Sequence, residues 1–152
     1  MGGMRVTPDV LLADLQPNDS AMLILAGNDI FATDAFVPFA DKAREFLAAG
    51  VPVAAICGAT GGLAIAGLLD DREHTSNARE FLAGTGYAGG HHYRDEPVVT
   101  DRDLITATSV APVYFARAIL ARLDVFEPPV LDSWYKLFGD QNPAGFFELM
   151  SA

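Results

Sequence analysis

The sequence predicts a single α/β domain over residues 1–152, with a mostly parallel sheet covered by helices on both faces. Two apolar runs, residues 21–26 and 51–56, have the length and continuity of buried parallel strands. A helical pattern follows each run after only a few residues. Strand and helix alternating in this way are typical of βαβ units, in which crossover helices cover the sheet. A chain of 152 residues is long enough to bury the core of one such domain.

Composition and charge narrow the range of partners. Half of the residues are hydrophobic and a fifth are charged, which argues against disorder. Twenty acidic residues outnumber ten scattered basic ones, so the net charge of −10 disfavours nucleic acid and anionic membranes. No apolar run is long and unbroken enough to span a bilayer, and no leader pattern opens the chain. We therefore expect a cytoplasmic protein that acts on a small molecule.

The first half of the chain predicts two strand–helix units. After the first strand, Thr33 or Asp34 can cap a helix that Gly50 ends. The apolar residues of this helix recur at helical spacing: Phe36, Phe39, Ala40, Ala43 and Leu47. The strand over residues 51–56 leads into Cys57, and a helix of small residues follows from Gly58 to Leu69.

The second half predicts a turn at residues 70–72, an extended piece at 73–76 and a helix over 78–83 that Asn77 can cap. A glycine-rich loop then leads to two strands, residues 97–100 and 104–107, and to a helix over 111–123. The chain ends in a helical region with many aromatic residues: Trp134, Tyr135, Phe138, Phe146 and Phe147. Aromatic residues at this spacing indicate a core or a dimer surface.

Cys57, the only cysteine, lies where an apolar strand meets glycines. A side chain at such a turn projects from the carboxyl edge of the sheet and faces the positive end of a helix, which favours a thiolate. A buried core thiol is the alternative. Gly27 and Asn28 follow the neighbouring strand, so they and Gly58 meet Cys57 at one edge of the sheet, where ligands collect. The backbone N–H groups of the two glycines can hold an anion, or the glycines can simply form tight turns. Asn28 can equally be a turn former, a helix cap or part of a pocket wall.

Several segments together resemble the ThiJ/PfpI family of the class I glutamine amidotransferase-like superfamily. They cover most of the chain in a similar order: Val6-Thr7-Pro8-Asp9-Val10, Leu23-Ile24-Leu25-Ala26-Gly27-Asn28-Asp29, Ala54-Ala55-Ile56-Cys57-Gly58-Ala59-Thr60, Ala66-Gly67-Leu68-Leu69-Asp70, His74-Thr75-Ser76-Asn77 and residues 99–107. The resemblance implies a flavodoxin-like three-layer sandwich, usually a homodimer. It also implies that Cys57 is the elbow nucleophile, with N–H groups of Gly58 and of Gly27 or Asn28 as the oxyanion site.

The sequence departs from the family pattern at two places. The family begins with a further strand and helix that carry a glutamate, and residues 1–4 resemble the end of that block. The two histidine positions usual in the family hold Gly58 and Asn77. His74 lies three residues before Asn77, and in an extended chain the two side chains point to opposite faces. His74, His91 or His92 is therefore the histidine that we expect to approach Cys57, and we expect no metal ion or cofactor.

Three functions remain open. The first is a cysteine-dependent hydrolase or amidase-like enzyme, with a small amide or aldehyde as substrate. The second is a redox-responsive or chaperone-like dimer in which Cys57 oxidises to sulfinic acid. The third is a pseudoenzyme derived from a shortened family member.

Overall fold

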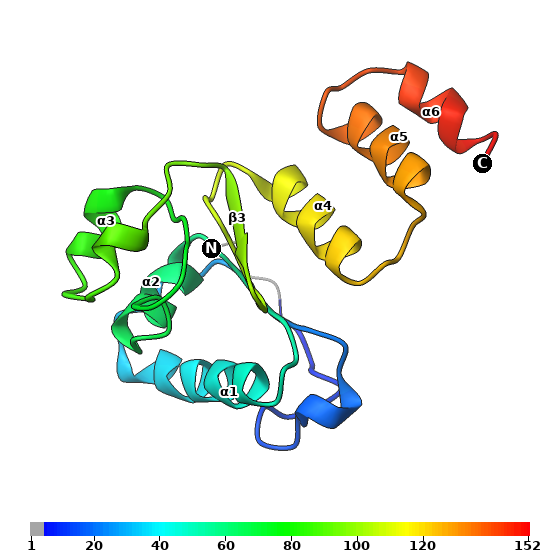
Figure 1. The fold of residues 1–152 in the computed structure, drawn as a ribbon. Coiled ribbons are helices and arrows are strands. Elements are labelled where there is room, and N and C mark those ends of the chain that lie inside the picture. The colour runs from blue at the N-terminus through cyan, green and yellow to red at the C-terminus, as the bar shows by residue number, and fades with distance from the viewer. Residues whose placement is uncertain (1–4) are drawn as a thin grey trace.

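Four short strands form the sheet in the order β1-β2-β4-β3 within residues 5–152, which are the residues that the computed structural model describes (Figure 1). The strands are β1 (Leu23–Leu25), β2 (Val53–Ile56), β3 (Val98–Asp101) and β4 (Leu104–Ala107). Strands β1, β2 and β4 are parallel, and β3 is antiparallel to β4. The predicted α/β fold with a mostly parallel sheet is confirmed. The expectation for residues 1–4 lies outside the described residues.

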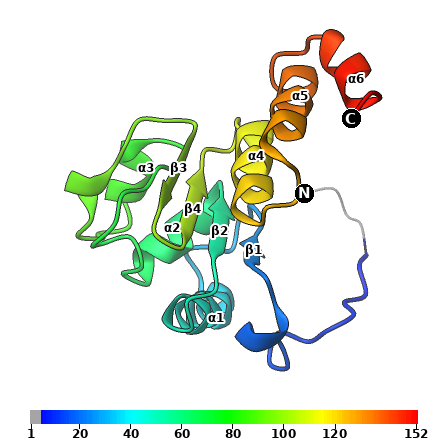
Figure 2. The same ribbon diagram turned by 45° about the vertical axis from the view of Figure 1, so that its right-hand side comes forward.

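Helices cover the sheet on both faces and make three layers (Figure 2). The helices α1 (Val37–Ala48) and α2 (Gly58–Ile65) lie on one face, and α4 (Pro112–Arg122) lies on the other. Leu23 and Leu25 of β1 belong to the larger core, together with Phe46 of α1 and Leu63 of α2. A smaller core joins Phe115 of α4 to the opposite face of β2 and β4.

Short elements complete the part of the fold that precedes β3. The 3-10 turns are η1 (Pro17–Asp19), η2 (Asp34–Phe36) and η3 (Gly90–His92), and the short helix α3 is Arg79–Ala83. Neither Thr33 nor Asp34 caps α1 directly, because η2 precedes that helix and the Thr33 hydroxyl instead donates to the carbonyl of Ile30 at 2.8 Å. The helix after Cys57 ends four residues earlier than predicted, at Ile65, and Gly67 follows it with a φ of 72°.

The first strand also differs from the expected buried strand. It is shorter, and Ile24 is 51% exposed, because among residues 5–152 β1 pairs only with β2 and forms an edge of the sheet. Apolar composition predicted the strand, but burial depends on neighbours that the local sequence does not specify.

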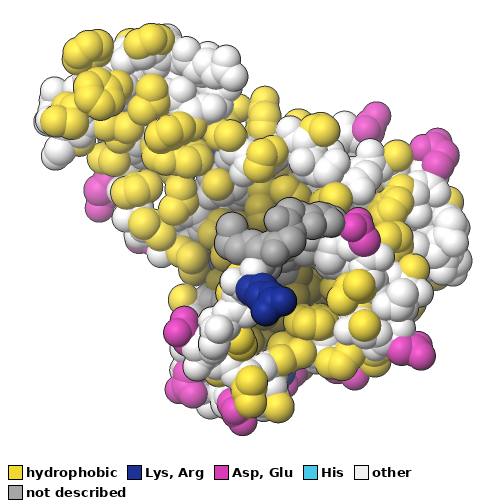
Figure 3. All heavy atoms as spheres, turned by 180° about the vertical axis from the view of Figure 1, so that it is seen from behind, with side chains coloured by type: hydrophobic (Ala, Val, Ile, Leu, Met, Phe, Trp, Pro, Cys, Tyr) yellow, Lys and Arg dark blue, Asp and Glu magenta, His cyan; other side chains and the backbone are white. Residues whose placement is uncertain are grey.

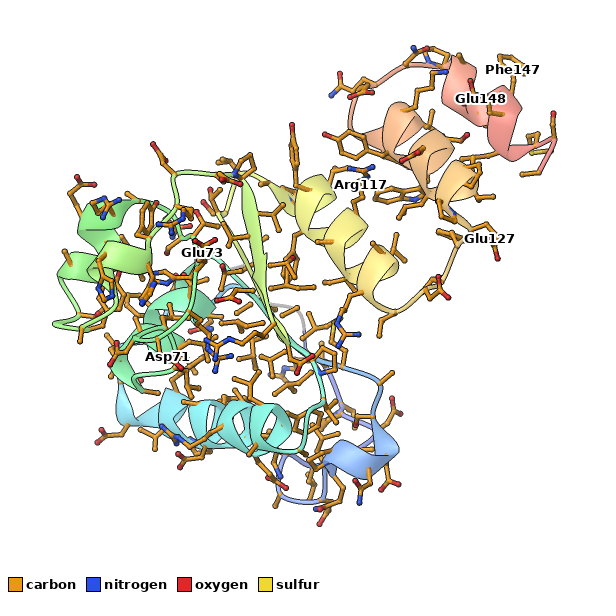
Figure 4. All side chains as sticks on the ribbon, viewed as in Figure 1. Asp71, Glu73, Arg117, Glu127, Phe147 and Glu148 are labelled. Carbon is orange, nitrogen blue, oxygen red and sulfur yellow. The ribbon has the colours of Figure 1, made fainter. Side chains whose placement is uncertain are left out.

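The C-terminal region forms two helices, α5 (Pro128–Phe138) and α6 (Ala144–Leu149), which stand off the sheet (Figures 1 and 2). Arg117 of α4 fixes α5: it pairs with Asp132 at 2.8 Å and lies over the ring of Tyr135, 4.7 Å from its centre (Figure 4). On α6, Phe147 points away from α5 and is 69% exposed (Figure 4). Phe138 and Phe146 are also at least half exposed, so the aromatic side chains at the end of the α5–α6 pair are not core residues. None of the helices described in residues 5–152 is both long and apolar enough to span a bilayer.

Candidate active site

Cys57 forms a strained elbow between β2 and α2. Its φ of 59° is positive, which is rare and costly for a residue with a Cβ atom, at roughly 1–3 kcal/mol. Backbone contacts hold this conformation: its N–H donates to the carbonyl of Ala107 at 3.1 Å, and its own carbonyl accepts the N–H of Thr60 at 3.1 Å. The thiol is half-buried and free of any disulfide.

Two glycines allow the loop after β1 to lie against the elbow. A Cβ atom on Gly27 would lie 2.9 Å from Cβ and 3.4 Å from Sγ of Cys57. A Cβ atom on Gly58 would lie only 2.0 Å from the carbonyl oxygen of Asn28. Gly27, Asn28, Cys57 and Gly58 therefore meet at one edge of the sheet, where the sequence predicted that they would be neighbours.

Asn28 adds an unusual polar atom to this edge. Its side-chain Nδ2 donates to the carbonyl of Ala26 at 3.2 Å, whereas Oδ1 is buried and has no hydrogen-bond partner among the described residues. Buried acceptors are normally paired, so this unpaired oxygen is an exception among the described residues.

Asn77 is the side chain that contacts the thiol. Its Nδ2 donates to Sγ of Cys57 across 3.7 Å, and its Oδ1 accepts the backbone N–H of Ser109 at 3.0 Å. Both ends of the amide are therefore used, which fixes the amide orientation. The predicted capping role of Asn77 is wrong, because α3 begins at Arg79 with Ala78 at its cap position and Asn77 turns to the elbow instead.

A buried pair of hydroxyls connects the elbow to the segment that carries Asn77. The Thr60 hydroxyl lies 2.6 Å from the carbonyl of Cys57 and 2.6 Å from the hydroxyl of Ser76. A carbonyl only accepts, so Thr60 donates to Cys57 and Ser76 donates to Thr60. This chain of bonds couples the position of Asn77 to that of the elbow.

His74 does not approach the thiol. Its side chain is fully buried, with Nδ1 2.8 Å from the carbonyl of Arg72 and Nε2 3.0 Å from the hydroxyl of Tyr87. The carbonyl requires the proton on Nδ1, so Nε2 accepts from Tyr87. Burial lowers the pKa of His74, and the ring is neutral at neutral pH. As strand alternation predicts, His74 and Asn77 point into different surroundings.

The other two histidines pack against each other with tilted rings. The ring centres of His91 and His92 are 3.9 Å apart within η3, so the extended conformation that would separate them does not occur. Across residues 5–152, Asn77 provides the hydrogen bond recorded at Sγ, and no histidine does so. The described residues also contain no group of three or more His, Cys, Asp or Glu side chains arranged to hold a metal ion.

Sequence reasoning missed three residues of this site: Thr60, Ser76 and Ser109. Thr60 lies one helical turn beyond Cys57, a spacing at which a hydroxyl can reach the elbow carbonyl. No local signal identifies Ser76 or Ser109, because their partners come from distant parts of the chain.

The fold and this edge define a class of protein: a three-layer α/β domain with a strained, half-buried cysteine between a parallel strand and a helix. A model of the DJ-1/PfpI family matches residues 1–122, and the chain belongs to that family.

Individual relatives agree with this assignment. The chain is 40% identical over 153 residues to "Uncharacterized protease YoaZ" of Bacillus subtilis (strain 168), with 99% of this chain and 73% of that protein covered. The crystal structure of a thiJ/pfpI family protein from Bacillus anthracis superposes with a TM-score of 0.92 at 40% identity, covering 99% of this chain and 72% of that one. The DJ-1 superfamily protein Atu0886 from Agrobacterium tumefaciens gives a TM-score of 0.82 at 33% identity, covering 92% of this chain and 75% of that one.

Proposed function

We propose that this protein is a cysteine-dependent hydrolase of small amides, with Cys57 as its nucleophile. The observation that carries the proposal is the strained elbow, which holds Sγ at the head of α2 beside a glycine-lined wall. Strain at a functional residue persists only where surrounding contacts enforce it, and here two backbone bonds do so.

The reaction begins when the Cys57 thiolate attacks the substrate carbonyl carbon. An S–C bond forms, and the carbonyl π electrons move to the oxygen. The N–H of Gly58 is in the first turn of α2, where amides have no partner within the helix, and it stabilises this oxyanion together with N–H groups of Gly27 or Asn28. Collapse breaks the C–N bond, the amine leaves with a proton from water, and a second water hydrolyses the thioester to regenerate the thiol.

Asn77 is a positioning residue in this scheme. Its amide donates to Sγ and cannot accept the thiol proton, so it orients the sulfur and stabilises the thiolate without acting as a base. Water must then carry the protons, which predicts a modest turnover. The names of relatives such as YoaZ also support a hydrolytic role.

Turnover of model amides by the wild-type protein and by Cys57→Ser tests the proposal, with methylglyoxal as a second substrate class. We expect amide turnover that disappears in Cys57→Ser. Equal turnover in the two proteins would refute a cysteine nucleophile, and turnover of methylglyoxal alone would replace the amide with an aldehyde.

The amide donor that Asn77 places at Sγ favours a second candidate, a redox-responsive thiol. Two molecules of hydrogen peroxide oxidise the thiolate, the first to sulfenate and the second to sulfinate. In each step an S–O bond forms, the O–O bond of the peroxide breaks, and the peroxide is reduced to water or hydroxide. Asn77 Nδ2 would then donate to a sulfinate oxygen. A gain of two oxygens on Cys57 under mild peroxide, together with no amide turnover, favours this candidate over the hydrolase.

A further inference from the structure

A cavity of about 390 Å³ opens beside Asn77, the residue whose amide contacts the Cys57 thiol. Its lining runs from Ser76 and Asn77 to the loop before α4 and to the segment that joins η3 to β3. The loop before α4 also fixes Asn77, because the N–H of Ser109 donates to its Oδ1 at 3.0 Å. Cys57 is not part of the described lining, so Asn77 is the side chain that the thiol and the cavity share.

A substrate held at the thiol can extend into this cavity. Its carbonyl carbon bonds to Sγ, and Nδ2 of Asn77 lies 3.7 Å from the same sulfur. The acyl group stays on Sγ through both steps of the reaction, whereas the amine leaves after the first. A side chain of the acyl group that passes Asn77 therefore enters the cavity, and the lining determines which acyl groups fit.

The charged side chains of the lining are both acidic. Asp95 and Glu96 contribute carboxylates, and the described lining includes no lysine, arginine or histidine. Both residues are exposed, and within residues 5–152 neither forms an ion pair. The adjacent Arg94 pairs with Glu73 instead. The two carboxylates are therefore available to a cationic ligand.

The backbone that carries these carboxylates is anchored on both sides. The buried Thr75 hydroxyl donates to the carbonyl of Glu96 at 2.7 Å, and the N–H of Thr108 donates to the carbonyl of Pro97 at 3.1 Å. Thr75 lies two residues before Asn77, so these bonds join the acidic segment to the segment that contacts the thiol. A backbone fixed in this way reduces the entropy that is lost when a ligand binds.

Apolar and aromatic side chains form another part of the lining. They include Val110, which is 86% exposed, and Tyr114 of α4, which is 44% exposed. The methylene groups of a long side chain can pack on such surface while its charged end stays in water. The face of a tyrosine ring also attracts a cation. The cavity thus fits an aliphatic chain that ends in a positive charge.

Resting on the hydrolase proposed above, we infer that this cavity is the acyl-group subsite and that Asp95 and Glu96 select amides whose acyl group carries a cationic aliphatic side chain. A chain like that of lysine has this form. Its methylene groups pack against Val110 and Tyr114, and its ammonium group interacts with the two carboxylates. An acyl group with a negative end meets like charge and is rejected.

Three amides that differ at the end of the side chain test this subsite: the N-acetylated α-amides of lysine, norleucine and glutamate, which are cationic, neutral and anionic. At low salt, where screening is weakest, we expect kcat/KM for the release of ammonia to favour the lysine amide over the norleucine amide by about tenfold. The glutamate amide should be the poorest substrate. The double variant Asp95→Asn, Glu96→Gln should lower the preference for the lysine amide to about one.

The control removes the same charge elsewhere. Acidic side chains are spread over the surface, as on the face seen from behind (Figure 3), and the net charge of −10 attracts any cation. The double variant Asp14→Asn, Glu80→Gln changes two exposed acids outside the cavity and should keep the preference. An unchanged preference in the cavity variant, or an equal loss in the control, would overturn the inference.

Binding to Cys57→Ser separates this subsite from the hydrolase. Cys57 does not line the cavity, so that variant keeps the subsite. Isothermal titration should show the lysine amide binding about tenfold more tightly than the norleucine amide, and the added changes Asp95→Asn and Glu96→Gln should remove the difference. This result without turnover by the wild-type protein supports the subsite and refutes the hydrolase. Equal binding of the three amides overturns the subsite, with or without turnover.

Discussion

Replacing Gly58 with alanine tests the close contact on which the site depends. The new Cβ atom would lie 2.0 Å from the carbonyl oxygen of Asn28, whereas carbon–oxygen contacts in proteins rarely fall below about 3.3 Å. The two backbones must therefore separate by about 1.3 Å. The helix α2 cannot move easily, because every residue from Gly58 to Ala64 is buried, so the loop carrying Asn28 must shift.

Overpacking of this kind costs about 1–3 kcal/mol, and the helix propensity of alanine recovers less than about 1 kcal/mol. We expect urea unfolding to show Gly58→Ala destabilised by about 1–2 kcal/mol, and alkylation of Cys57 to change in rate. Gly90→Ala is the matched control, because a Cβ there meets nothing within 4 Å, and it should stay within about 0.5 kcal/mol of wild type. A Gly58→Ala protein as stable as wild type would refute the close approach of the two segments.

Three further predictions concern the groups around the elbow. Asn77→Ala removes the amide donor to Sγ, a hydrogen bond worth about 1 kcal/mol, so iodoacetamide should alkylate Cys57 about fivefold more slowly at pH 7. The control is Asn18→Ala, at an exposed asparagine outside the site, which should leave the alkylation rate unchanged. Thr60→Val leaves the buried Ser76 hydroxyl without its partner and removes one of the two donors to the Cys57 carbonyl, so it should cost about 1–3 kcal/mol in urea unfolding. A loss no larger than that caused by the exposed substitution Thr33→Val would contradict this. Because burial lowers the pKa of His74, the unfolded chain binds a proton before the folded chain does as the pH falls below about 6.5. The free energy of unfolding should therefore drop between pH 7 and 5.5, by at most about 1.4 kcal/mol per pH unit. A His74→Gln protein whose free energy of unfolding depends on pH in the same way would contradict this.

The sequence predicted the elbow because its signals are local. An apolar run followed by Cys57 and Gly58 predicts a strand that ends where a helix begins, and the structure has β2 and α2 at that place. Period-two alternation likewise separated His74 from Asn77. Both predictions use only residues within one short segment.

The contacts of the site required information that is not local. Asn77 satisfies the pattern of a helix cap equally well, and only the approach of Ser109 and Cys57 in space decides its role. Burial of β1 depends on which strands lie beside it, so the apolar run alone predicted a core position for Ile24 that the edge does not provide.

The central proposal is that Cys57 attacks the carbonyl carbon of the substrate. Mass spectrometry of protein quenched with acid during turnover tests this most directly. The protein is mixed with an amide of a small acyl group, quenched within one turnover and digested. We predict the acyl mass on the peptide that contains Cys57, its loss after longer incubation, and no adduct in Cys57→Ser. Turnover with no adduct on this peptide at any time, or turnover that persists in Cys57→Ser, would contradict a covalent role for the elbow cysteine.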